Sequence, residues 1–105
     1  MKNLIILSGL IFFSANTFCA MRTSPDMFME GSGVTNCGDA RIANDAQNNC
    51  REYIRNLEQR NPSCMYRYLN YRYWNADAEY NKRWDGKRSC KYRATYKCEY
   101  KESCD

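Results

Sequence analysis

Basic residues gathered near one end of the chain are the side chains with the clearest chemical potential. Residues 82–101 hold eight Lys and Arg residues against two acidic ones, a net charge of +6, whereas residues 21–81 carry −1. Tyrosine and tryptophan residues are interleaved with these cations. A concentrated positive field attracts anions and steers their association. The residues expected to bind an anion are Lys82, Arg83, Lys87, Arg88, Lys91 and Arg93.

The expected partner is a phosphoinositide or another anionic membrane lipid, because clusters of Lys and Arg bind such headgroups when they lie at a membrane surface. The sequence shows no strongly amphipathic segment rich in Leu or Phe, so this contact would be peripheral rather than integral. An acidic protein, bound by an inhibitor or effector, is the alternative partner. A solvated face that only aids solubility is the simplest alternative. Nucleic acid is a less expected partner for an exported chain.

Catalysis is poorly supported, because the chain contains no histidine and histidine is the commonest general base near neutral pH. A pair of carboxylates could still hydrolyse a glycan, and the candidates are Glu52, Glu58, Asp77 and Glu79. On the expected helices these side chains lie away from the apolar stripes and would be solvated. We therefore expect a non-enzymatic protein without a cofactor, and keep a small glycan hydrolase as an alternative.

The first residues predict export. A short positive start precedes ten apolar residues, LIILSGLIFF at 4–13, and the small and polar residues that follow complete a signal peptide assigned to 1–20. Ten apolar residues are too few to span a bilayer, which takes roughly 20. We expect a secreted, extracellular protein after cleavage, with residues 21–36 as a mobile N-terminal segment and 37–105 as one domain.

Six cysteines remain after the signal peptide, and an even number in a short exported chain predicts disulfides. A zinc site is disfavoured because there is no histidine and no C-x-x-C pair, so no metal is expected. The mature chain has few branched aliphatic residues, and we expect the disulfides to supply much of its stability.

Three helices are predicted in the domain. Ala43, Ala46, Cys50, Ile54 and Leu57 recur at helical spacing over 39–60, with Asp39 as a candidate cap and Asn61-Pro62 as the end. A second stripe of apolar and aromatic residues runs over 63–85 and consists of Tyr66, Leu69, Tyr73, Ala76, Tyr80 and Trp84. Asp85-Gly86 is instead typical of a hairpin turn, and short stretches of 63–85 alternate like a strand. Residues 88–104 fit either a helix or a strand.

The positions of the cysteines favour a helix over 88–104. In an up-down-up bundle the first and third helices are parallel, and their cysteines pair at similar heights as Cys37–Cys90, Cys50–Cys98 and Cys64–Cys104. The predicted fold is an all-α, three-helix bundle stapled by three disulfides. The alternative is an α+β fold with a C-terminal β-hairpin.

Two segments, MKNLIILSGLIFF and NYRYWNADAEYNKRW, give the chain a composition that resembles small disulfide-bonded secreted proteins of Legionella-type bacteria. This resemblance implies folding and disulfide formation in a periplasmic intermediate, followed by type II secretion. It also implies a virulence-related effector role toward a host, whose membranes or acidic proteins would be the partners.

Overall fold

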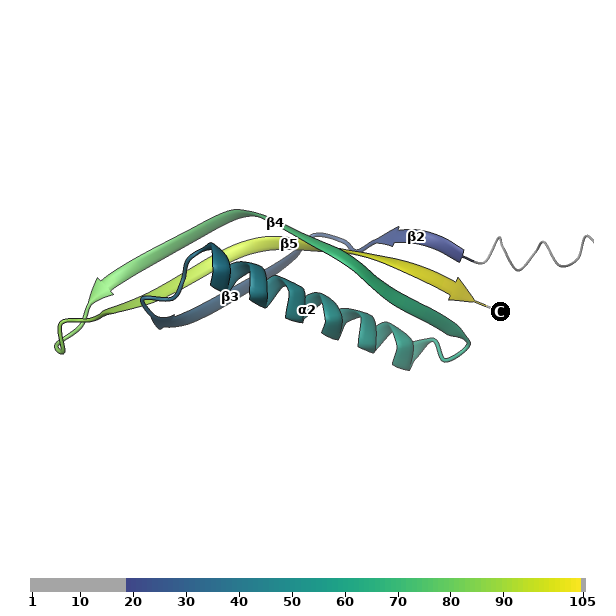
Figure 1. Ribbon diagram of the computed structural model, residues 1–105, viewed down its shortest axis with the longest axis horizontal. Coiled ribbons are helices and arrows are strands. Elements are labelled where there is room, and N and C mark those ends of the chain that lie inside the picture. The colour runs from purple at the N-terminus through teal and green to yellow at the C-terminus, as the bar shows by residue number, and fades with distance from the viewer. Residues whose placement is uncertain (1–18, 105) are drawn as a thin grey trace, which may run out of the picture.

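The computed structural model describes residues 19–104, which form one helix packed on an antiparallel sheet (Figure 1). The strands are β2 (Cys19–Thr23), β3 (Met27–Val34), β4 (Cys64–Lys82) and β5 (Arg88–Cys104), and the helix is α2 (Asp39–Arg60). The three-helix bundle predicted from the sequence is therefore wrong. The C-terminal β-hairpin of the alternative fold is present, formed by β4 and β5.

Strand β5 is the centre of the sheet. It pairs with β4 along one side, and on the other side with β3 in its first half and β2 in its second half. Residues expected to be a mobile leader thus contribute β3, and Met29 of this strand is buried in the core. The expected signal peptide lies outside the described residues except for Cys19 and Ala20, which begin β2.

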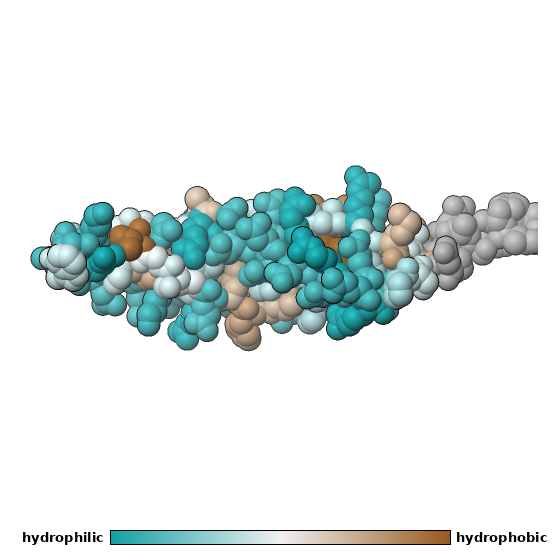
Figure 2. Space-filling model, turned by 90° about the horizontal axis from the view of Figure 1, so that it is seen from below, coloured by the Kyte–Doolittle hydropathy of each residue, from teal (hydrophilic) through white to brown (hydrophobic). Residues whose placement is uncertain are grey.

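The helix over 39–60 is confirmed, with its apolar stripe turned to the sheet, and the face of the molecule shown in Figure 2 is mostly hydrophilic. Ile42, Ala46, Cys50 and Ile54 are its buried residues. The N-cap is Gly38, without a side-chain cap bond, so Asp39 does not cap the helix as expected. Asp39 lies in the first turn instead, where its charge favours the helix dipole. Asn61 ends the helix, and its backbone N–H donates a hydrogen bond to the carbonyl of Leu57.

Tyrosine and cystine build most of the remaining core. Even-numbered residues of β5 point to the helix, and Cys90, Tyr92, Tyr96, Cys98 and Tyr100 are all less than 10% exposed. Partly buried tyrosines of β4 pack against them. The opposite face of the sheet, called here the outer face, is covered by no element among residues 19–104. In an antiparallel sheet one covered and one solvated face is the common arrangement.

Three disulfides tie the layers together. Cys37–Cys90 and Cys50–Cys98 join the helix side to β5, and Cys64–Cys104 joins the open ends of β4 and β5. These are the same three pairs expected from the sequence, although they join a helix to a strand and a strand to a strand rather than parallel helices. The bonds are compatible with an oxidising extracellular environment.

Candidate functional site

The tip of the β4–β5 hairpin holds most of the basic residues that the sequence singled out. The tip is defined here as residues 82–88, and in Figure 1 it extends beyond the start of α2 and the end of β3. The amide of Gly86 bonds to the carbonyl of Arg83 at 3.1 Å, and Gly86 has a positive φ of 83°. This is a turn followed by a left-handed glycine, a usual way to close a three-residue hairpin loop. Asp85-Gly86 therefore forms a hairpin turn, as is typical of this dipeptide.

Polar contacts within the tip fix its shape. The Arg83 guanidinium lies 3.1 Å from the Asp85 carboxylate, which also accepts a hydrogen bond from the Lys87 amide at 3.1 Å. The Arg88 guanidinium lies over the Tyr80 ring, 5.7 Å from its centre. Since Asp85 is neutralised by Arg83, the remaining cations leave the tip positively charged.

Trp84 is the most exposed large apolar side chain of the described residues, at 94%. The sequence analysis placed it on the buried stripe of a helix, and that assignment is wrong. The hairpin-turn dipeptide Asp85-Gly86 next to it was the signal that could have placed it in a loop, because the residue before such a dipeptide lies at a turn rather than in a core.

The base of the tip is anchored to the rest of the domain. Cys90 lies two residues after Arg88 and is bonded to Cys37, just before α2. The amide of Thr35 also donates to the carbonyl of Arg88 at 3.1 Å. The tip is therefore held at a fixed position relative to α2.

Two of the six predicted anion-binding residues lie elsewhere. Lys91 and Arg93 project from the outer face of β5, where Glu79 pairs with Lys91 and where Asp77 and Glu30 flank Arg93. Opposite charges across strands compensate one another, so these two cations add little to the field of the tip. The structure brings together Lys82, Arg83, Lys87 and Arg88 alone.

The carboxylates considered for glycan hydrolysis are divided between two layers. Glu52 and Glu58 belong to α2, and Asp77 and Glu79 to β4 on the outer face. Within residues 19–104, one group of possible metal ligands brings the sulfurs of Cys64 and Cys104 and a Glu102 carboxylate oxygen within 4.8 Å of one another. The two sulfurs are bonded to each other, so they cannot act as thiolate ligands.

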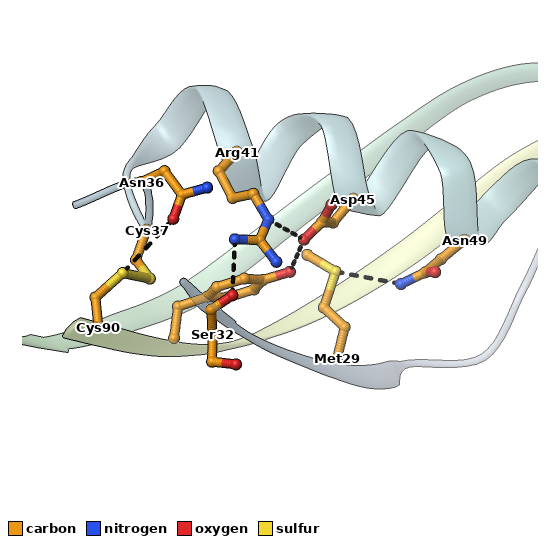
Figure 3. Close-up of polar contacts among 9 residues, drawn as sticks. Met29, Ser32, Asn36, Cys37, Arg41, Asp45, Asn49 and Cys90 are labelled. Carbon is orange, nitrogen blue, oxygen red and sulfur yellow. Dashed lines mark hydrogen bonds and ion pairs between the residues drawn. A yellow bond between two sulfur atoms is a disulfide. The ribbon is translucent and has the colours of Figure 1, made fainter. Parts of the chain in front are cut away.

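A polar network under the first half of α2 is the main feature that the sequence analysis missed (Figure 3). Arg41 donates to Asp45 at 2.9 Å and to the backbone carbonyl of Ser32 at 3.2 Å. The Tyr92 hydroxyl donates to the same Asp45 carboxylate. A side chain added at Gly31 would overlap the Tyr92 ring and approach the Arg41 guanidinium. The i,i+4 spacing of Arg41 and Asp45 was the available signal.

Burial raises the pKa of Tyr92 to about 12, and the hydrogen bond to Asp45 acts in the same direction. Tyr92 is therefore a neutral donor over the whole physiological range. The network joins the helix to the sheet.

Comparison of the chain with protein-family models, curated proteins and solved structures finds no match. No helix among the described residues is long and apolar enough to cross a membrane.

Proposed function

We propose that this protein is a secreted, non-enzymatic binding protein that uses the hairpin tip to contact anionic membrane headgroups, phosphoinositides among them. The observation that carries the proposal is the 94% exposure of Trp84 in the tip, beside Lys82, Arg83, Lys87 and Arg88. An indole exposed to this extent buries almost none of its surface in the protein's own core, so it contributes little to the stability of the fold.

A membrane surface suits each part of the tip. Tryptophan is enriched at membrane–water interfaces, where its apolar ring and its N–H are both accommodated. Each Lys or Arg near an anionic surface contributes about 1 kcal/mol to binding. The anchored base of the tip avoids part of the ordering cost that a flexible loop would incur on binding. The contact would be peripheral, because a turn of this size reaches only the headgroup region.

Export supports a membrane partner outside the cell of origin. The proposed signal peptide and the disulfides together fit secretion through a periplasmic intermediate, as in the bacterial proteins that the composition resembles. An effector that meets a host membrane is the role this proposal assigns.

Liposome co-sedimentation tests the proposal. The oxidised protein should sediment with vesicles containing phosphoinositide or phosphatidylserine and remain in solution with neutral vesicles. Charge reversal of Arg83, Lys87 and Arg88 should weaken binding at least tenfold, given about 1 kcal/mol per charge. Reversal of Lys91 and Arg93 is the matched control and should change binding little, because carboxylates already flank them.

An acidic protein partner is the second candidate, since the same four cations would serve it. It is favoured if a single acidic protein binds through the tip while the vesicles give no response. Equal sedimentation with neutral and anionic vesicles, or no effect of the tip reversals, rejects the lipid proposal.

A further inference from the structure

A short row of aromatic side chains crosses the outer face of the sheet, on the side away from α2. Phe28 of β3 and Trp74 of β4 are the two cross-strand neighbours of Thr95 on β5. Phe28 is 82% exposed, although it lies within a strand. Thr95 is only 8% exposed, although no element among residues 19–104 lies over this face. The large neighbours therefore shield the threonine and form a low apolar platform.

Polar residues of both signs border this platform. The next cross-strand row is Glu30–Arg93–Asp77, and on the other side Arg72 pairs with Lys97. Arg72 and Lys97 form ion pairs with Glu99 and Asp26. Because each cation of the border has an acidic neighbour, the border offers hydrogen-bond donors and acceptors without a one-signed field. A polyanion would meet the carboxylates of Glu30 and Asp77, so an anionic ligand is disfavoured here.

Two adjoining hollows lie beside the platform. One has a volume of about 310 Å³ and is lined by Phe28, Asp77 and Arg93 among others. The other, of about 270 Å³, shares Asp77 and Arg93 and reaches Glu30. Each is near the lower limit of small-molecule sites, and an apolar floor with a few converging polar groups is their usual composition.

The backbone at this place is irregular. The pairing of β4 with β5 shifts between Trp74 and Asp77, and Asn75 has a positive φ of 55°. Bulges bend a strand and re-aim its side chains, and they are frequent next to binding sites. Here the bulge lies between the aromatic row and the charged row.

We propose that the outer face is a binding platform for a neutral oligosaccharide, stacked on Phe28 and Trp74 and hydrogen-bonded by Asp77, Arg93 and Glu30. Sugar rings present C–H faces that pack on the electron-rich faces of aromatic rings, while their hydroxyls lie at the ring edge and pair with donors and acceptors of either kind. The ligand is neutral because the border of the platform is electrically mixed. This site is separate from the tip and does not depend on it.

Calorimetric titration of the oxidised protein with neutral tetrasaccharides of glucose, N-acetylglucosamine, mannose and xylose tests the proposal. At least one should bind saturably at millimolar or lower concentration, with an affinity that is the same at low and high salt, because no net charge is involved. Phe28→Ala should weaken binding about tenfold, at the lower end of what stacking of a nucleobase on an aromatic side chain contributes. Asp77→Asn should weaken it several-fold.

Met65→Ala is the matched control, since Met65 is 76% exposed on the outer face but lies opposite Ser103, outside the aromatic row. Its affinity should equal that of the wild type. Phe28 is so exposed that its replacement leaves the fold intact, which circular dichroism can verify. The proposal is overturned if no tetrasaccharide binds, or if Phe28→Ala and Met65→Ala bind alike.

Discussion

At the scale of single residues, one carboxylate of the helix connects it to the sheet. Asp45 accepts hydrogen bonds from both Arg41 on α2 and Tyr92 on β5, so a single side chain joins the two layers. Tyr92 is 1% exposed, and Gly31 leaves the space that its ring occupies. The bond between Tyr92 and Asp45 is part-buried, and a hydrogen bond to a charged group typically contributes about 1.5–3 kcal/mol. Two substitutions test this contribution.

Tyr92→Phe should lower the free energy of unfolding by about 1–3 kcal/mol at neutral pH, because the Asp45 carboxylate loses a donor. It should also change the response to alkali. The pKa of Tyr92 is raised to about 12 in the folded state from about 10 when unfolded, so its stabilising effect is complete below about pH 10 and is lost as the pH rises toward 12.

Denaturant unfolding at several pH values measures this effect. The fall in stability above about pH 10 should be shallower in Tyr92→Phe than in the wild type, with part remaining because burial also raises the pKa of Tyr100 to about 12. Tyr80→Phe, at an exposed position, should keep the wild-type slope. A Tyr92→Phe slope equal to that of the wild type would contradict the account.

Gly31→Ala should also destabilise the domain, by about 1–3 kcal/mol, because the new methyl group overlaps the Tyr92 ring. Ser32→Ala, at the next position and on the outer face, is the matched control and should have little effect. The transition temperatures of the two variants in thermal unfolding measure this effect. Equal transition temperatures would show that the Tyr92 ring does not require a glycine at position 31.

At the scale of elements, β4 shows why the sequence prediction failed. The alternation of Tyr66 and Tyr68 breaks at Leu69-Asn70, and this break favoured a helix. The structure has a bulge there, between Tyr68 and Asn70, and a second one between Trp74 and Asp77. At the first bulge the helix-facing side chains change from even-numbered to odd-numbered positions, and at the second bulge they change back. The two shifts leave Tyr66, Tyr73 and Tyr80 on the helix side at intervals of seven residues, and seven residues are also about two turns of a helix.

The helix α2 could be predicted because nothing interrupts its period. Its expected range of 39–60 matches the structure. The four cations of the tip could also be found, since charge is read from composition. The placement of carboxylates beside Lys91 and Arg93 could not be predicted, because it depends on which residues of the neighbouring strands lie opposite β5.

The loop between β3 and α2 carries a local strain that can be tested. Thr35 has a positive φ of 58°, a conformation that costs non-glycine residues roughly 1–2 kcal/mol and is unusual for a β-branched one. Thr35→Gly should raise the free energy of unfolding by up to about 1 kcal/mol, since glycine's greater unfolded-state entropy offsets part of the gain. Thr23→Gly, within β2, should lower it. Equal destabilisation by both would contradict this reading.

At the scale of the whole molecule, the cysteine spacing held information that the helical prediction overlooked. Fourteen residues separate Cys50 from Cys64, but only six separate their partners Cys98 and Cys104. At a helical rise of 1.5 Å these spans are about 21 and 9 Å, which do not match, whereas six residues of a strand span about 20 Å. This part of the disulfide ladder therefore fits a strand opposite the helix better than a second helix.

The disulfides should also determine whether the domain is stable. The buried core holds few aliphatic residues, and loss of a native disulfide typically costs about 2–5 kcal/mol in a small secreted domain. Reduction of all three should abolish the cooperative thermal transition that the oxidised protein shows by circular dichroism. A reduced sample that retained a sharp transition would contradict this expectation.

The central claim is that Trp84 enters an anionic membrane surface, and its own fluorescence tests this most directly. The chain has two tryptophans, so Trp74→Phe leaves Trp84 as the only one. With vesicles containing phosphoinositide, we expect its emission to shift to the blue and to be quenched by brominated lipids. Neutral vesicles, or reversal of Lys87 and Arg88, should remove both effects. An emission spectrum that anionic vesicles leave unchanged would contradict the account.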